Sequence, residues 1–227
     1  MPTQKAIIFD SGSLISMAMS SLYDEIISLK KSFGGKFLIT KEVREEIIDK
    51  PITMKRFALE AMKLKELINK GILELPESIG VSEKEISQSM LELMELANNS
   101  FVGDKVPIKL IDLGETSCVA LSKFLSEKGI QNILVVDERT LRLLIEDPPL
   151  LKKIFQKRLK AKINFIPEKL KTFKGIKVIR STELVYIAYK KGLIQIKEKN
   201  LLDALLYSLK FSGCAITDEE IEEIEKL

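Results

Sequence analysis

Residues 5–10 read KAIIFD, and residues 132–137 read NILVVD. Both stretches are short apolar runs rich in β-branched residues, and both end abruptly in an aspartate. Continuous apolar runs of this length are typical of strands buried on both faces, as in a parallel sheet. Ligands of such sheets bind beyond the carboxyl ends of the strands, where Asp10 and Asp137 fall. The two stretches therefore predict a parallel sheet with two acids at its binding edge.

The segments around these strands have helical spacing or strand-like composition. We expect helices over residues 14–31, 51–70, 82–97, 112–128, 182–191, 201–211 and 218–226. Shorter strands are expected near 37–39, 72–75, 163–166 and 177–179, and a loop over 98–107. Thr40 has the position of a helix N-cap, and Ser82–Glu85 and Thr217–Glu220 have capping-box spacing. Alternation of strands and helices predicts an α/β fold, with a central parallel sheet between helical layers and extra helices.

The chain of 227 residues contains no histidine and only two cysteines, Cys118 and Cys214. A Ser/His/Asp or Cys/His nucleophile cannot be assembled without an imidazole, and zinc sites usually need Cys/His clusters. Chemistry must therefore use carboxylates, lysines, hydroxyls or hard cations. No stretch approaches the roughly eighteen apolar residues of a membrane span, and residues 1–5 (MPTQK) precede no extended apolar run. We expect a soluble, cytoplasmic protein.

Basic residues are concentrated between positions 152 and 180, where Glu168 is the only acid. Such a block serves either a polyanionic partner or a solvated helix face, and the sequence leaves both interpretations open. The candidate nucleic-acid contacts are Lys152, Lys153, Lys157, Arg158, Lys160 and Lys162.

Further acids fall where helices begin. Glu46 lies in the first turns after strand 37–39, and Asp112 and Glu115 start the helix over 112–128. Two unit charges 4 Å apart repel by about 4 kcal/mol at an effective dielectric of 20, so converging carboxylates imply a bound cation. Oxygen ligands without His or Cys suit Mg²⁺ or Mn²⁺, and these ions commonly serve phosphoryl chemistry.

Each of these acids also has a purely structural interpretation. Asp112 and Glu115 have the spacing of a capping box, and Asp137 could be an N-cap. Glu46 could be one more exposed glutamate. Asp10 is hardest to explain in this way, because an unpaired charge at the edge of the core is costly. Other acid-after-strand folds lose support: a haloacid-dehalogenase-type phosphatase needs a second aspartate where Gly12 stands.

The order of these motifs resembles the PIN domain, a metal-dependent nuclease fold, and in particular its archaeal and bacterial toxin-like subgroup. The residues that carry the resemblance are 7–15, 39–47, 113–121, 135–142, 184–194, 201–205 and 216–221. The resemblance implies one PIN-like domain over residues 1–227. It does not cover a helical insertion of about residues 51–107 or a basic elaboration of about 151–176.

The resemblance implies a ribonuclease in which Mg²⁺ or Mn²⁺ is held by Asp10, Glu46, Glu115 and Asp137. Asp112 and Glu138 would be auxiliary acids, and Arg142 would brace Asp137 or Glu138. Many members carry Ser, Thr or Asn where this chain has Gly12, so Ser11 or Ser13 would take over that role. The implied partners are RNA and a cognate antitoxin or other protein, with a homodimer also open. The alternative is a non-catalytic PIN-fold module that binds RNA or a protein.

Overall fold

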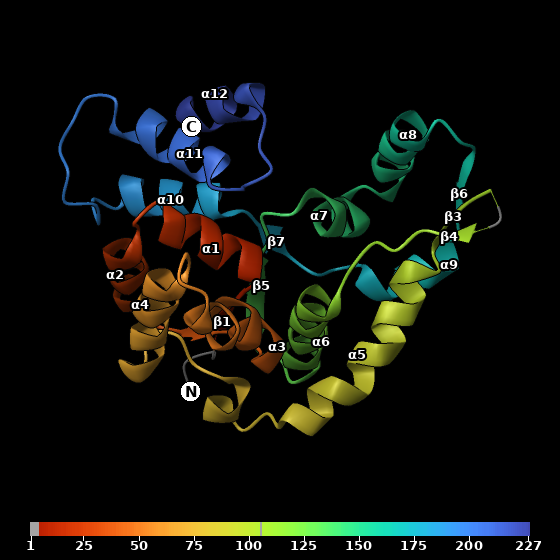
Figure 1. Ribbon diagram of the computed structural model, residues 1–227, viewed down its shortest axis with the longest axis horizontal. Coiled ribbons are helices and arrows are strands. Elements are labelled where there is room, and N and C mark those ends of the chain that lie inside the picture. The colour runs from red at the N-terminus through yellow and green to blue at the C-terminus, as the bar shows by residue number, and fades with distance from the viewer. Residues whose placement is uncertain (1–4, 105) are drawn as a thin grey trace.

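Figure 1 presents the computed structural model of the chain, which describes residues 5–104 and 106–227. Residues 1–4, at the expected start of the domain, and residue 105, in the expected loop, lie outside the described residues. The described part is a mixed α/β fold with one four-stranded and one three-stranded sheet. None of its helices is long and apolar enough to cross a membrane.

The four-stranded sheet is parallel throughout and contains both of the stretches that end in an aspartate. Its order is β2 (Lys36–Leu38), β1 (Lys5–Phe9), β5 (Gln131–Val135) and β7 (Val178–Ile179). Phe9 is in register with Val135, and the Asp10 amide donates to the Val135 carbonyl at 3.1 Å. The expected parallel sheet is confirmed, and Asp10 and Asp137 follow neighbouring strands.

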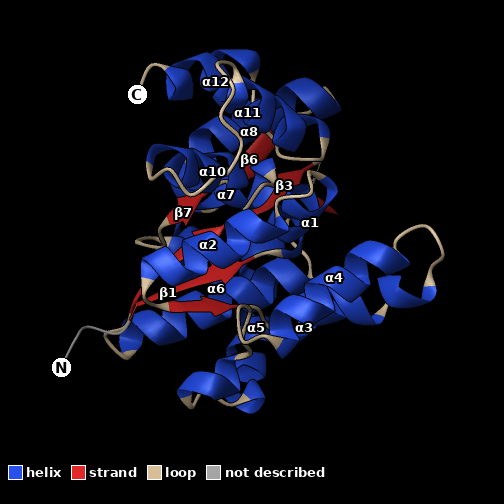
Figure 2. Ribbon diagram, turned by 90° about the vertical axis from the view of Figure 1, so that its left-hand side faces the viewer, coloured by secondary structure: helices blue, strands red, loops and turns tan. Residues whose placement is uncertain are grey.

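Helices pack on both sides of this sheet. Figure 2 shows the strands between α2 on one side and α6 on the other. The elements around the sheet are α1 (Ser11–Met19), α2 (Tyr23–Phe33), α3 (Lys41–Arg44), the π-helical turn η1 (Glu45–Asp49), α6 (Leu113–Glu127), α7 (Arg139–Glu146), α10 (Ser181–Lys190), α11 (Leu201–Phe211) and α12 (Asp218–Glu225). The core between them includes Phe9 and Phe37, whose fully buried rings meet edge to face at 5.1 Å.

The two segments that the PIN resemblance does not cover contribute to one second lobe, at the right of Figure 1. The lobe contains α5 (Glu83–Asn98), β3 (Phe101–Gly103), β4 (Val106–Pro107), α8 (Pro148–Leu159), β6 (Ile163–Phe165), α9 (Pro167–Leu170) and the 3₁₀ turn η4 (Lys171–Phe173). Its antiparallel sheet has the order β4-β3-β6 and joins the two segments, with the rings of Phe101 and Phe165 stacked at 5.5 Å.

Several local expectations differ from the structure. The helix expected over residues 51–70 begins only at Ala58, after the 3₁₀ turn η2 (Pro51–Thr53). Residues 14–31 form two helices, because Ser21 takes a left-handed conformation (φ 59°) between them. Residues 72–75 form only one bridge, from Glu74 to Leu38, after α4 (Ala58–Asn69) and before the 3₁₀ turn η3 (Pro76–Ile79). The expected loop over 98–107 contains β3 and β4. The strand near 163–166 pairs with β3 rather than with the parallel sheet, a long-range choice that local composition does not encode.

Candidate functional site

Asp10 is deeply buried at the end of β1, with 3% of its surface exposed. It caps α1, since its Oδ2 accepts from the Gly12 amide at 3.3 Å. Its Oδ1 is buried and has no hydrogen-bond partner among the described residues. Burial raises the pKa of Asp10 to about 7. The negative charges of Asp112 and Glu46 add to this rise, and hydrogen bonds from backbone N–H groups oppose it. A buried carboxylate oxygen without a partner is costly, so the chain keeps this group at the expense of stability.

Glu46 lies in the π-helical turn η1 and places its carboxylate against the first turn of α6. A Cβ built on Gly114 would come within 2.8 and 2.9 Å of the Glu46 Oε1 and Oε2 atoms. Only glycine leaves room for this approach. The carboxylate thus lies near the positive end of the α6 dipole. Burial raises the pKa of Glu46, whereas a hydrogen bond from the Ser11 hydroxyl and the positive charge of Lys50 oppose this rise.

Asp112 and Glu115 form the capping box that their spacing predicts. The Glu115 amide donates to Asp112 Oδ1 at 3.1 Å, and the Asp112 amide donates to Glu115 Oε2 at 3.0 Å. Burial raises the pKa of Glu115 to about 8, and the negative charges of Asp10, Asp112 and Glu138 add to this rise. Glu115 therefore combines a structural role at one oxygen with a place in the acidic group.

Asp10, Glu46 and Glu115 are brought together with the exposed Asp112 beside them; we call these four residues the acid group. Asp112 raises the pKa of each of the other three, which places their charges within electrostatic reach of one another. Within residues 5–104 and 106–227, however, no three acidic or thiol side chains are close enough to hold a metal ion as they stand. The four predicted metal ligands are thus not assembled into a coordination shell.

Asp137, the fourth predicted ligand, has both carboxylate oxygens engaged elsewhere. Oδ1 accepts from the Ser181 amide at 2.8 Å, and Oδ2 accepts from the Ser181 hydroxyl at 2.7 Å. The Asp137 carbonyl also accepts from the Ala215 amide at 3.0 Å. Asp137 is 2% exposed and connects the end of β5 to the N-terminus of α10, where its charge is favourable.

Replacing Ser181 by alanine is expected to lower the free energy of unfolding by about 1–3 kcal/mol, because Asp137 Oδ2 would stay buried without a donor. Urea denaturation measures this directly. Ser212→Ala serves as the control, since Ser212 makes a hydroxyl–hydroxyl contact with Ser20 nearer the surface. Equal midpoints for the two variants would mean that the Asp137–Ser181 contact carries no stability.

The expected brace by Arg142 is not what the structure contains. Arg142 lies 4.0 Å from Glu146 and 3.8 Å from Glu220 rather than against Asp137 or Glu138. Glu220 also accepts from Arg180 at 2.8 Å. The sequence places Arg180 in the basic block and does not indicate this pairing, because its partner Glu220 lies in α12, 40 positions later in the chain.

The remaining auxiliary candidates have separate partners. Glu138 is exposed and caps α7, with Oε2 accepting from the Leu141 amide at 2.9 Å. Ser13 is buried and donates to the Asp10 carbonyl at 2.8 Å. Ser11 faces Glu46, whose pKa its hydroxyl lowers. Of the two serines, Ser11 is the one that faces the acid group with its side chain.

The candidate nucleic-acid contacts lie on the second lobe. Lys153, Lys157 and Arg158 are exposed on α8, and Lys160 and Lys162 are exposed in the turn that leads to β6. Lys152 is half-buried, with its Nζ 5.9 Å from the centre of the Phe165 ring. In the described part of the chain none of these six cations is paired with an acid, which leaves their charge available to a polyanion.

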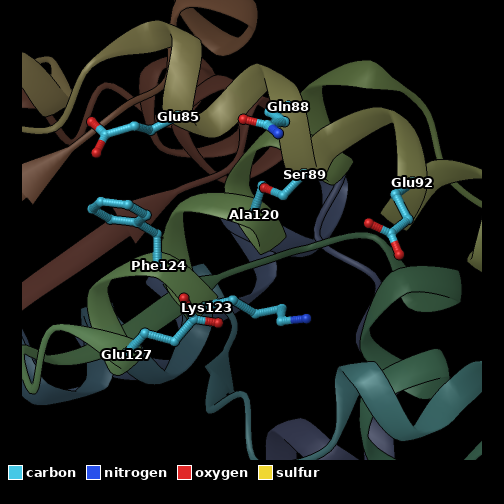
Figure 3. A pocket seen from close by; sticks show the side chains of 8 residues that line it. All are labelled: Glu85, Gln88, Ser89, Glu92, Ala120, Lys123, Phe124 and Glu127. Atoms are coloured by element: carbon cyan, nitrogen blue, oxygen red, sulfur yellow. The ribbon is translucent and has the colours of Figure 1, made fainter.

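A groove of about 310 Å³ between α5 and α6 is separate from the acid group (Figure 3). Its walls carry Glu85, Glu92 and Glu127 together with Lys123. Glu85 is already engaged in the capping box of α5 with Ser82. Mixed charges and an existing structural role give this groove no distinctive chemistry.

Comparison of the chain with protein-family models, with curated proteins and with solved structures finds no match in any of the three. The functional argument therefore depends on the chain's own residues and on the motif resemblance.

Proposed function

We propose that this chain is a divalent-metal-dependent endoribonuclease of the PIN type that hydrolyses RNA phosphodiester bonds. The observation that carries the proposal is Asp10 Oδ1, a buried carboxylate oxygen without a partner at the edge of a parallel sheet. The parallel sheet with helices packed on it supports a PIN-like three-layer arrangement. A toxin-like role and a role in RNA processing are both compatible with this activity.

The donor set of the acid group fits Mg²⁺ or Mn²⁺. Carboxylate oxygens are the ligands that these hard cations prefer. The charges that raise the pKa of Asp10 belong to two further carboxylates, Asp112 and Glu46. Asp10, Glu46 and Glu115 would hold the ion, whereas Asp137 would first have to release Ser181. When bound, the ion would supply charge stabilisation at the phosphate and a more acidic water.

The chain's own residues supply position and charge around this ion. The N-terminus of α6 and the close approach of Gly114 fix the Glu46 carboxylate. Unused carboxylate oxygens such as Asp10 Oδ1 can accept a hydrogen of the attacking water. Lys50, which lowers the pKa of Glu46, adds a cation next to the acids that can hold a phosphate of the substrate.

The proposal is tested by titrating Mn²⁺ into the protein by calorimetry and by incubating it with a labelled single-stranded RNA in Mn²⁺ or EDTA. We expect binding, and cleavage only with Mn²⁺, with both lost in Glu46→Gln. Glu45→Gln, at a half-buried position on the same turn, is the matched control. A wild-type protein that neither binds Mn²⁺ nor cleaves RNA would overturn the proposal.

The second lobe would guide the RNA backbone, and the affinity for RNA should then depend on the salt concentration. Replacing Lys153, Lys157 and Arg158 by glutamine is expected to reduce the slope of log affinity against log salt by about 0.7 per lost phosphate contact, or about 2 in total. Fluorescence anisotropy with a non-cleavable RNA measures the slope. The charge-matched control replaces the exposed Lys191, Lys197 and Lys199 by glutamine. Equal slopes in the two triple variants would remove the lobe from the interface.

A non-catalytic RNA- or protein-binding module is the second candidate. The bonding of Asp137 to Ser181 favours it, because it takes one acid out of the proposed metal set. RNA binding that is unchanged in Glu46→Gln, together with no cleavage by the wild type, would favour this function over hydrolysis.

A further inference from the structure

Thr40 and Ser117 form a buried hydroxyl pair between the helical segment that carries Glu46 and the first turns of α6. Their hydroxyl oxygens lie 2.6 Å apart, and neither side chain has any exposed surface. Thr40 is the N-cap of α3, which continues directly into the turn η1. Figure 1 shows α3 beside α6, and the two helices are in contact. Fully satisfied polar contacts in a core rigidify the elements that they join.

The hydrogen bonds on either side of this pair decide which hydroxyl donates. Ser117 Oγ donates to the Gly114 carbonyl at 2.7 Å, and a serine hydroxyl has only one hydrogen. Thr40 must therefore donate to Ser117, while its own Oγ1 accepts from the Val43 amide at 3.3 Å. The result is one directional chain of hydrogen bonds from the Val43 amide to the Gly114 carbonyl. Each bond in such a chain polarises and strengthens the next.

This chain connects the two sides of the contact between Glu46 and α6. One end is Gly114, where a Cβ would come within 2.8 Å of Glu46 Oε1. The other end is in α3, which forms one continuous helical segment with η1 and so carries Glu46. Groups in a metal or catalytic site have to be held within about 0.5 Å of their working positions. A contact as close as that of Glu46 with Gly114 therefore depends on how α3 is placed against α6.

The next residue along α6 connects this helix to the strand that ends at Asp10. Cys118 is fully buried, and its Sγ donates to the Phe9 carbonyl at 3.5 Å. Ser117 and Cys118 thus join α6, which carries Glu115, to both of the other elements that supply a predicted ligand. A thiol is a weak donor, so the hydroxyl chain is the stronger of the two connections.

We propose that Ser117 and Thr40 are positioning residues, which hold the Glu46 carboxylate against α6 and so set the affinity of the acid group for a divalent cation. The effect on affinity rests on the proposed metal-dependent function. Neither hydroxyl is a ligand, since both are buried and engaged in the chain. They act through the placement of α3 against α6. Groups that orient metal ligands typically change metal affinity by 10- to 100-fold when they are replaced, on the order of what we expect here.

Ser117→Ala tests the inference against a matched control, Ser122→Ala, on the same helix. Ser122 is also buried, and its hydroxyl donates to Asn132 Oδ1 at 2.6 Å, at the opposite end of β5 from Asp137. Each substitution removes one buried hydroxyl, so both should lower the urea midpoint. Only Ser117→Ala is expected to weaken Mn²⁺ binding in calorimetry, by about tenfold or more. Equal Mn²⁺ affinities in the two variants would overturn the inference.

Thr40→Val and Thr40→Ser separate the hydroxyl from the rest of the side chain. Valine keeps the shape of threonine and loses the hydroxyl, whereas serine keeps the hydroxyl and loses a methyl group. Thr40→Ser should retain Mn²⁺ affinity within about threefold, and Thr40→Val should lose as much as Ser117→Ala. The double variant should lose no more than either single one, because the two hydroxyls act as one unit. Additive losses, or equal losses with serine and valine, would contradict the positioning role.

A measurement without metal keeps this result separate from the ribonuclease proposal. In EDTA, the side-chain carboxyl ¹³C signal of Glu46 is expected to shift in Ser117→Ala and to keep its wild-type position in Ser122→Ala. An unchanged signal in Ser117→Ala would overturn the inference even if the wild type bound Mn²⁺ and cleaved RNA. A shift confined to Ser117→Ala, in a protein that neither binds Mn²⁺ nor cleaves RNA, would remove the ribonuclease function and leave the positioning of Glu46 standing.

Discussion

Replacing Asp10 by asparagine is expected to reduce Mn²⁺-dependent RNA cleavage by at least about 10³-fold, while the protein stays folded. The amide keeps an oxygen that can accept from the Gly12 amide, so the cap of α1 is retained. It removes the negative charge at Oδ1, the oxygen that no described residue satisfies. The rate is measured with a labelled RNA under single-turnover conditions. The control is Asp24→Asn, the same change at an exposed position in α2.

The same substitution is expected to stabilise the metal-free protein at pH 8. Asp10 has a pKa of about 7 in the folded chain against 3.8 for the unperturbed group. The folded state therefore binds more protons than the unfolded state between these values, and stability falls as pH rises from about 4 to about 7. Above pH 7 the full cost applies, about 4 kcal/mol at about 1.4 kcal/mol for each pH unit of the pKa change.

Urea denaturation in EDTA at pH 5 and pH 8 tests this part of the prediction. Wild type should gain stability on acidification, and Asp10→Asn should gain less, with a remaining gain from Glu115, whose pKa is about 8. Cleavage within about tenfold of wild type, or an asparagine variant less stable than wild type at pH 8, would contradict the assignment of Asp10. The second outcome would mean that Asp10 is primarily a structural cap.

Local patterns in the sequence predicted the elements that depend on neighbouring residues. The apolar runs before Asp10 and Asp137 became β1 and β5, because buried parallel strands have a composition that is visible within five residues. The capping boxes at Ser82, Asp112 and Thr217 all formed, since each needs only a residue three positions away. Asp10, Glu46 and Glu115 could likewise be selected because each follows a strand or opens a helix.

Contacts between distant segments could not be predicted in this way. Asp137 is bonded to Ser181, 44 positions later, and nothing near either residue indicates that pairing. The pairing of β3 with β6 likewise depends on two segments that the PIN resemblance leaves out. Gly114 is a special case: its place after Asp112 and Leu113 was part of the motif, but the contact that requires glycine comes from Glu46 in another element. The geometry of the acid group is therefore a tertiary property.

Gly114→Ala is the variant expected to separate activity from folding most sharply. The added Cβ would lie 2.8 Å and 2.9 Å from the two carboxylate oxygens of Glu46, closer than real Cβ contacts allow. The carboxylate is the far end of a flexible side chain, so it can move away without unfolding the protein. Alanine also favours the helical conformation over glycine by up to about 1 kcal/mol, so α6 itself is not weakened. We expect at least a tenfold loss of Mn²⁺ affinity and of cleavage, with stability within about 1 kcal/mol of wild type.

Gly12→Ala is the matched control for this change. Gly12 is also close to a site carboxylate, but a Cβ there would lie 3.4 Å from Asp10 Oδ2, which is ordinary contact. Both glycines lie in the first turn of a helix, and neither has a positive φ, so the two substitutions differ mainly in what the new methyl group meets. Gly12→Ala should therefore retain metal binding within about threefold, a difference of less than about 1 kcal/mol. If both variants lost binding equally, the close packing of Glu46 on α6 would not explain the effect, and the position of that carboxylate would not govern the site.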